Sequence, residues 1–283
     1  MYHAKHSGSN KLQYFSQDLE KNARRRLLLE NSLRQAIDNS EFELYLQPKI
    51  SLDNHKVESA EALLRWKLES EFIPPPEFIS IAEQSGLILE IDQWVIDQAC
   101  RVINACKAMK LTPPRIAVNL SAMDIRDEMF VSNIISTFER HNISGHNFEF
   151  ELTETVLLEH NEKVTLALEQ LKQQGITLSI DDFGTGYSSI AYLQKLPIDN
   201  LKVDKSFIIN LEQQPQDKVL VRSIIKLAHS LNLKVVAEGV EDKSSVDFLS
   251  QNQCDFAQGF FFHRPMPVKN FLDLLKSHQE SAS

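Results

Sequence analysis

Eight polar or charged residues lie within, or at the end of, seven separate short apolar segments of this chain. They are Glu61, Asn119, Glu151, Asp181, Asp182, Lys202, Glu238 and Gln258. Polar residues that recur strand by strand along a chain of this length are how a parallel α/β barrel builds an active site. Five of the eight are carboxylates, and so much negative charge in one place requires cations. We therefore expect a divalent-metal site that acts on a molecule carrying oxygen anions.

Two adjacent aspartates, Asp181 and Asp182, end one apolar segment and precede a loop that contains Gly184 and Gly186. Adjacent strand residues face opposite sides, so both carboxylates can reach one site only where the strand ends and its pleat dissolves. There the pair could bridge two cations. The alternative is a surface turn with an aspartate helix cap, which Asp and Gly often supply.

Other acids follow the same pattern on neighbouring segments. Glu151 and Glu154 end the preceding segment, so one could face a metal while the other holds the next loop; the alternative is a helix cap. Asn119 offers a neutral oxygen ligand, although a lone asparagine at a strand end is commonly a turn former. Glu238 closes a near-continuous apolar run, which is typical of a buried parallel strand, and should emerge at the barrel mouth. Its alternative is an ordinary turn acid before Gly239.

Two charged residues interrupt apolar segments instead of ending them. A glutamate inside an apolar strand, such as Glu61, is unfavourable unless it is paired or bound to a metal. Arg65 lies four residues on, hence on the same strand face, where its guanidinium could hold a phosphate through two parallel hydrogen bonds. Lys202 shares a strand face with Asp204 in the same way. The alternatives are two simple ion pairs, Glu61–Arg65 and Lys202–Asp204.

Apolar segments of strand character alternate with segments of helical period. Amphipathic spacing marks helical faces at residues 91–102 and 164–171, and Gly86 and Gly175 are expected helix stops. Eight strands with intervening helices over about 245 residues favour a (β/α)8 barrel over an open sheet. Only residues 51–56 join the first two strands, too few for a parallel crossover, so the first strand should run antiparallel. The expected strands are Glu43–Ile50, Val57–Trp66, Ile116–Leu120, Phe148–Leu152, Thr177–Ile180, Asn200–Val203, Lys234–Ala237 and Asp255–Phe262.

The composition narrows the class of protein. The chain has 283 residues, 42% of them hydrophobic, and a net charge of −9 without a basic tract, which argues against binding a nucleic-acid polymer. Its three cysteines form no CxxC pair, which favours a reducing, cytoplasmic setting. No segment approaches the roughly 18 apolar residues of a membrane-spanning helix. A longer parent protein could still carry a membrane anchor.

Taken together, the motifs resemble those of the EAL family of cyclic di-GMP phosphodiesterases, in family order over residues 40 to 275. They are Glu61-Ala62-Leu63, Asn119-Leu120-Ser121, Glu151-Leu152-Thr153-Glu154, Asp181-Asp182-Phe183-Gly184-Thr185-Gly186, Leu201-Lys202-Val203-Asp204, Ala237-Glu238-Gly239-Val240-Glu241 and Gln258-Gly259-Phe260. The resemblance implies a (β/α)8 TIM-like barrel with one reversed strand. It also implies hydrolysis of cyclic di-GMP to linear pGpG with two Mg²⁺ or Mn²⁺ ions, whereas Ca²⁺ would bind but support turnover poorly.

The resemblance assigns metal ligands by position. The ligands of one ion would be Glu61, Asn119, Glu151 and Asp181. Asp181 would bridge to a second ion, which Asp182 and Glu238 would also hold.

It assigns catalytic and binding roles as well. Lys202 would contact the attacking water, Glu238 would be the general base, and Gln258 would orient water or substrate, with Glu61 completing the catalytic set. Glu154 would anchor the loop Asp182–Ser189, which in the family contributes to dimerisation together with the adjacent helix. The substrate contacts would be Gln47, Arg65, Asp204 and Glu241.

The N-terminal part divides from the barrel. Residues 1–15 resemble the end of a GGDEF (diguanylate cyclase) domain, residues 16–39 are expected to form a linker helix, and residues 40–283 form the barrel. The resemblance implies GGDEF or sensor domains upstream in the same protein. The helix could either cap the barrel bottom or transmit a signal as a linker.

Two other functions remain open at this point. The domain could be a receptor that binds cyclic di-GMP without useful turnover, although family receptors usually have damaged ligand motifs and this chain does not. An unrelated metal-dependent barrel hydrolase would require several histidine ligands at strand ends, and only His263 lies beside one.

Overall fold

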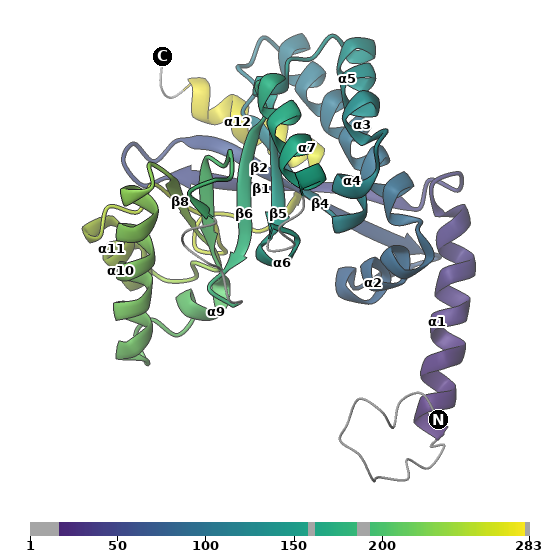
Figure 1. Ribbon diagram of the computed structural model, residues 1–283, viewed down its shortest axis with the longest axis horizontal. Helices are drawn as coiled ribbons and strands as arrows, with labels where there is room; N and C mark the ends of the chain where they lie inside the picture. The colour runs from purple at the N-terminus through teal and green to yellow at the C-terminus, as the bar shows by residue number, and fades with distance from the viewer. Residues whose placement is uncertain (1–16, 158–161, 186–192, 281–283) are drawn as a thin grey trace.

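The strands of the computed structural model, which describes residues 17–157, 162–185 and 193–280, pair into one closed ring (Figure 1). Around the ring the order is β1, β9, β8, β7, β6, β5, β4 and β2, and β2 pairs back with β1. The ring strands are β1 (Phe42–Ser51), β2 (Val57–Leu68), β4 (Arg115–Leu120), β5 (Phe148–Thr153), β6 (Thr177–Phe183), β7 (Asn200–Val203), β8 (Lys234–Ala237) and β9 (Phe256–Ala257). Two short strands, β3 (Glu71–Ile73) and β10 (Met266–Pro267), pair antiparallel with β2 and β1.

The direction of the first strand confirms the prediction from the short connection. β1 pairs antiparallel with β2 and with β9, whereas each of the other neighbouring pairs in the ring is parallel. The hairpin register places Gln47 opposite Glu61 and Lys49 opposite Ser59. The barrel is therefore of the (β/α)8 type with one reversed strand.

Helices cover the outside of the ring. They are α1 (Gln17–Ala36), α2 (Pro75–Ser85), α3 (Ile88–Ala108), α4 (Ala122–Arg126), α5 (Phe130–His141), α6 (Glu154–Leu157), α7 (Glu162–Gln173), α9 (Lys205–Ile208), α10 (Pro215–Ser230), α11 (Lys243–Gln251) and α12 (Val268–Glu280), with a 3-10 turn at Gly145–Asn147. α3 contacts β4, α7 contacts β6, α10 contacts β7 and β8, and α12 contacts β1. α3 and α7 confirm the two predicted helical faces.

Alternation along the strands separates an apolar outside from a polar inside. In β5, Phe148 and Phe150 pack in the hydrophobic core between sheet and helices, while Glu149 and Glu151 join buried polar contacts. Successive strand side chains face opposite sides of the sheet, so the two glutamates point into the barrel. The interior of this barrel is thus lined with charge, where apolar side chains usually fill the space.

Helix α1 does not cap the bottom of the barrel. Its buried residues Leu29, Leu33 and Ala36 pack with Trp66 near the C-terminal end of β2 and with Phe78 of α2. In Figure 1 the helix extends from the barrel on the side toward which the arrow of β6 points. Residues 20–28 of α1 are exposed, and Arg25 and Arg26 among them bond Glu77 and Gln84 of α2.

The last barrel strand is much shorter than predicted. The aromatic run suggested a strand over 255–262, but β9 covers only Phe256–Ala257 and the chain then turns. Gly259 lies so close to Val240 that a Cβ atom there would be 2.1 Å from the Val240 carbonyl oxygen. Phe260 and Phe261 are 46% and 41% exposed, so they are not core residues of a strand.

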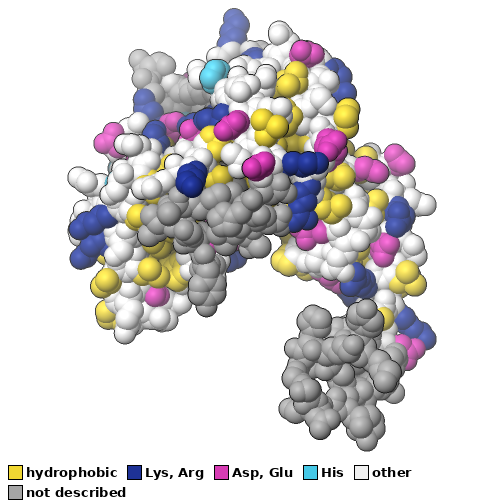
Figure 2. All heavy atoms as spheres, viewed as in Figure 1, with side chains coloured by type: hydrophobic (Ala, Val, Ile, Leu, Met, Phe, Trp, Pro, Cys, Tyr) yellow, Lys and Arg dark blue, Asp and Glu magenta, His cyan; other side chains and the backbone are white. Residues whose placement is uncertain are grey.

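The surface agrees with the charge analysis of the sequence. Figure 2 shows positive and negative side chains interspersed over one face, without a basic tract. Within the described residues, no helix combines the length and the apolar character needed to cross a membrane. The three cysteines are free thiols and are buried.

Candidate active site

The predicted residues meet at the mouth formed by the C-terminal ends of the parallel strands. A cavity of about 470 Å³ opens there. Its polar lining comes from Gln47, Glu61, Asn119, Asp181, Lys205, Glu238, Glu241 and Gln258. Leu63, Ile209, Phe260 and Pro265 add apolar wall. Side chains from separate strands therefore line one cavity, as their positions in the sequence predicted.

Lys202 lies at the centre of the carboxylates. Its Nζ is 2.5 Å from Oε2 of Glu151, 2.7 Å from Oε1 of Glu238 and 3.0 Å from Oδ1 of Asp181. The side chain is fully buried. Burial alone would lower the pKa of Lys202, but Glu151, Glu238 and the neighbouring acids raise it well above its ordinary value. The partners of Lys202 are therefore these acids and not Asp204.

Asp181 and Asp182 reach the same site because β6 is irregular where they lie. The pairing of β6 with β7 shifts register between Ile180 and Phe183, and Asp182 has a left-handed backbone with φ of 54°. Such a bulge changes the direction in which one side chain points. The sequence suggested that the strand ends where the two aspartates begin, but β6 continues through both of them to Phe183. The bulge brings both carboxylates to one side.

The acidic side chains at the mouth form a site suited to hard cations. Ligand atoms of Asp181, Asp182 and Glu238 lie within 4.8 Å of one another. Burial, together with Asp181 and Glu61, raises the pKa of Glu238 to about 8 against the opposing effect of Lys202. Burial and the nearby Asp181 also raise the pKa of Asp182. Oxygen donors crowded in this way are stabilised by divalent cations such as Mg²⁺, Mn²⁺ or Ca²⁺.

Amide side chains hold Glu61 in place. Asn119 donates from Nδ2 to Oε1 of Glu61 at 2.8 Å, and Gln258 donates from Nε2 to Oε2 at 2.6 Å. Gln258 also donates to Oε1 of Gln47 at 3.0 Å. Among the described residues, Oε1 of Gln258 is buried and has no hydrogen-bond partner. This acceptor is therefore available to a water or substrate donor.

Two predicted substrate contacts lie outside the cavity lining. Arg65 donates to the carbonyl of Leu64 at 3.0 Å and its guanidinium lies 5.4 Å from the ring centre of Tyr45. Asp204 caps α9 by accepting from the backbone N–H of Ser206 at 3.0 Å. Gln47 and Glu241 do line the cavity. The geometry thus places two of the four predicted substrate contacts at the cavity.

Glu154 is buried, and its Oε2 accepts a hydrogen bond from the backbone N–H of Gly184 at 3.2 Å. This contact ties the end of β5 to the start of the loop after β6. Residues 186–189 of the predicted dimerisation loop lie outside the described residues, so its anchoring as a whole stays a prediction.

Sequence reasoning missed a buried layer beneath the mouth. Lys49, on β1, lies 3.2 Å from Oε1 of Glu149 and also contacts Oε1 of Glu151. Both Lys49 and Glu149 are almost completely buried. The available signal was spacing, because Lys49 lies two residues beyond Gln47 and Glu149 two residues before Glu151, hence on the same strand faces.

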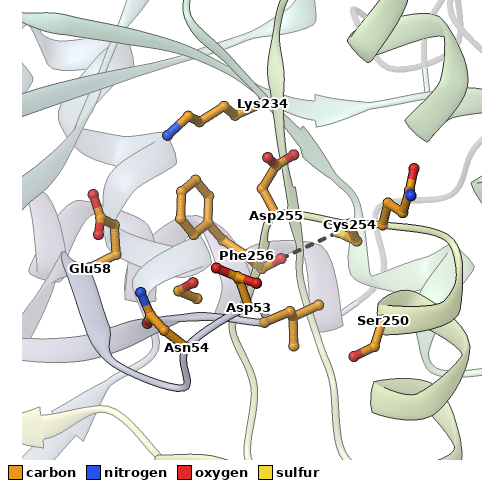
Figure 3. Close-up of a pocket in the computed structure, with 11 residues that line it drawn as sticks. Asp53, Asn54, Glu58, Lys234, Ser250, Cys254, Asp255 and Phe256 are labelled. Atoms are coloured by element: carbon orange, nitrogen blue, oxygen red, sulfur yellow. Dashed lines mark hydrogen bonds between the residues drawn. The ribbon is translucent and has the colours of Figure 1, made fainter.

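A second cavity, of about 580 Å³, lies at the opposite end of the barrel (Figure 3). Ser51, Lys234, Cys254, Asp255 and Phe256 line it, and Cys254 donates to the carbonyl of Phe256. None of the predicted site residues line this cavity. The acidic mouth is therefore the place where the predicted chemistry gathers.

The chain as a whole resembles known proteins. Residues 30–265 match the model of the EAL domain. The chain belongs to the EAL domain family. It is 37% identical to the cyclic di-GMP phosphodiesterase NbdA of Pseudomonas aeruginosa, over all of this chain and 36% of that protein. It is 39% identical to the bifunctional diguanylate cyclase/cyclic di-GMP phosphodiesterase MucR of the same organism, over 96% of this chain and 40% of that protein.

A solved structure also resembles this EAL domain closely. The PaMucR phosphodiesterase in complex with c-di-GMP matches it with a TM-score of 0.83 and 38% identity, over 86% of this chain and 99% of that one. The chain spans less than half the length of the two curated relatives.

Proposed function

We propose that this EAL domain is a metal-dependent phosphodiesterase that hydrolyses cyclic di-GMP to linear pGpG. The observation that carries the proposal is the acidic cavity at the barrel mouth, which Glu61, Asp181 and Glu238 line around Lys202. The names of NbdA and MucR support the choice of substrate.

Two Mg²⁺ or Mn²⁺ ions would fit the donors of this cavity. The first would be held by Glu61, Asn119, Glu151 and Asp181, and the second by Asp181, Asp182 and Glu238. When bound, such ions neutralise phosphate oxygens and make a water molecule more acidic. The carboxylate and amide oxygens match the hard-ligand preference of both ions.

The side chains of the cavity would divide the remaining work. Glu238 would be the general base that accepts a proton from the attacking water. Lys202, whose Nζ lies 2.7 Å from Oε1 of Glu238, would hold that carboxylate in place and contact the attacking water. Oε1 of Gln258, which is buried and accepts no hydrogen bond from the part of the chain that the structure describes, would orient the water or the substrate.

The rim of the cavity would receive the dinucleotide. Phe260 is exposed at the cavity, and the guanidinium of Arg264 lies 4.2 Å from its ring centre. An exposed aromatic face of this kind would stack on guanine. Gln47 and Glu241 would contact the substrate from the lining, and Arg65 and Asp204 from just outside it.

The partners of this domain form a further part of the proposal. The loop Asp182–Ser189 and the adjacent helix would form a homodimer contact, with Glu154 as the loop anchor at Gly184. Residues 1–15 would be the end of a GGDEF domain, 16–39 a linker helix and 40–283 the catalytic barrel. MucR, which is named as bifunctional, supports a cyclase partner in the same chain. The domain would work in the cytoplasm.

Hydrolysis tests the activity directly. The purified chain is incubated with cyclic di-GMP and Mg²⁺ or Mn²⁺, and pGpG is separated by liquid chromatography. Glu61→Gln should abolish the product, whereas Glu58→Gln, a control on the same strand whose partner is Arg115 at the other end of the barrel, should keep it. Ca²⁺ should support binding with little product. Tight binding of cyclic di-GMP without any pGpG in Mn²⁺ would replace this proposal with a receptor function.

A further inference from the structure

A polar layer lies directly beneath the acidic mouth, inside the barrel. Lys49, Glu149, Ser179 and Asn200 face inward there and are between 0% and 4% exposed. Burying charged groups so completely is unfavourable unless their hydrogen bonds are satisfied. The partners of each charge therefore indicate what the layer does.

Lys49 links this layer to the mouth. Its ammonium contacts Oε1 of Glu151, while the other carboxylate oxygen, Oε2, lies 2.5 Å from Lys202. Glu151 is thus held between two lysines, one below and one at the mouth. Rotation about the last side-chain bond of a glutamate is soft, so two partners on different oxygens fix a carboxylate that one partner would leave free to turn.

Glu149, the second partner of Lys49, has other donors. Its Oε1 accepts from Oγ of Ser179 at 2.5 Å and from Nδ2 of Asn200 at 3.2 Å. Loss of Lys49 would therefore leave Glu149 hydrogen-bonded but would leave Oε1 of Glu151 without its ammonium. The two contacts of Lys49 are not equivalent, since only the one to Glu151 reaches the mouth.

We propose that Lys49 is a positioning residue, which holds Oε1 of Glu151 so that Oε2 stays directed at Lys202 and the cation site. This inference rests on the proposed function, because it assumes that Glu151 is a metal ligand. Partners that orient a metal ligand from behind usually change metal affinity 10- to 100-fold when they are removed. The competing explanation is that Lys49 only neutralises Glu149 and supports the fold.

Three variants separate these explanations: Lys49→Met, Glu149→Gln and the double variant. The readouts are the Mn²⁺ affinity, from the electron paramagnetic resonance signal of free Mn²⁺, and the melting temperature without metal. Lys49→Met should bind Mn²⁺ at least about tenfold more weakly and melt at a lower temperature. Glu149→Gln, which leaves the Lys49–Glu151 contact intact, should bind Mn²⁺ within about threefold of the wild-type affinity.

The double variant is decisive. Removing both charges of the lower pair should recover much of the melting temperature, while the Mn²⁺ affinity stays about tenfold weak. This variant carries the test if Lys49→Met alone does not fold. Recovery of both readouts, or unchanged Mn²⁺ affinity in Lys49→Met, would overturn the positioning role. Wild-type protein that binds Mn²⁺ but releases no pGpG would contradict the proposed activity alone, and failure of the wild type to bind Mn²⁺ would contradict both.

Discussion

A buried pair of acids away from the mouth predicts how the free energy of unfolding depends on pH. Asp92 of α3 and Asp124 of α4 are 8% and 1% exposed, and their carboxyl groups lie within hydrogen-bonding reach of each other. Asp124 accepts from the N–H and the hydroxyl of Ser121 at 2.8 and 2.5 Å. Oδ2 of Asp92 faces no donor among the described residues. The pair is satisfied when Asp92 keeps a proton and donates it to Asp124.

The energetic consequence follows from linkage. Burial, Asp124 and Glu83 of α2 raise the pKa of Asp92 well above its ordinary value. The folded state then binds one more proton than the unfolded state, so the free energy of unfolding falls as pH rises. With an unfolded pKa of about 3.9, the loss is about 1.4 kcal/mol per pH unit until the folded pKa is reached. Between pH 5 and pH 7 it amounts to at most about 2.7 kcal/mol.

Asp92→Asn tests this reasoning, because the amide can donate to Asp124 without binding a proton. Chemical unfolding at pH 5 and pH 7 should show the variant gaining up to about 2.7 kcal/mol relative to the wild type at the higher pH. Asp97→Asn on the same helix is the matched control. Its carboxylate lies 2.7 Å from His141 and 2.9 Å from Arg101, and against the effect of burial these bonds lower the pKa of Asp97.

The control should not depend on pH in this range. Because the pKa of Asp97 is lowered in the folded protein, its stabilising contribution is complete above the unfolded pKa of about 3.9 and is lost only below it. Asp97→Asn should therefore change the free energy of unfolding by the same amount at pH 5 and at pH 7. Parallel stability curves for the wild type and Asp92→Asn between pH 5 and pH 7 would mean that Asp92 is ionised in the folded protein, and the argument for a shared proton would fail.

Three further outcomes follow from the structure. Gly259→Ala should destabilise the fold by about 3 kcal/mol in denaturant titrations, because its Cβ would overlap the backbone of Val240. Gly86→Ala should cost only about 1–2 kcal/mol, because its φ is 79° but its Cβ would meet only the end of the Met123 side chain, at 4.0 Å. Mn²⁺ at 100 times its dissociation constant should stabilise the folded protein by about 2.7 kcal/mol. This corresponds to a rise in melting temperature on the order of 5 °C. The Asp181→Asn variant should show little of this rise. Leu33 is buried between α1 and the barrel, so Leu33→Ala should release α1. Proteolysis near residue 30 should then be faster, while hydrolysis of cyclic di-GMP is retained. An unchanged rate of proteolysis would mean that the buried face of α1 does not hold the helix against the barrel.

The strands were predicted best from the sequence where runs of apolar residues are buried in the sheet. β7 and β8 have the predicted bounds, and β5 extends the prediction by one residue. The prediction for β9 was wrong because Phe260 and Phe261 have strand propensity, yet the close approach of Gly259 to Val240 turns the chain. The two-residue and three-residue strands β10 and β3 were missed, since so few residues carry no periodic signal.

The site could be predicted at the mouth but not below it. Residues that end parallel strands converge by geometry, so their positions in the sequence were sufficient. Lys49 and Glu149 lie within strands, and the residues next to each of them are apolar and face outward. The strands were predicted from these apolar residues, so the inward-facing charges were not considered as part of the site. Asp92 was missed for a related reason. It is a buried residue of α3, and that helix was predicted from the spacing of its apolar residues alone.

The reversed direction of β1 sets the order in which its residues reach the two layers. The parallel strand β5 reaches the lower layer first with Glu149 and then the mouth side with Glu151. β1 runs from the mouth inward, so Gln47 meets Gln258 near the mouth and Lys49 lies one layer deeper. The hairpin register fixes this arrangement, with Gln47 opposite Glu61. A slip of one residue would turn Gln47 and Lys49 outward and place Pro48 between Glu151 and the lower layer. The long hairpin between β1 and β2 is therefore a requirement of the site as well as of the barrel closure.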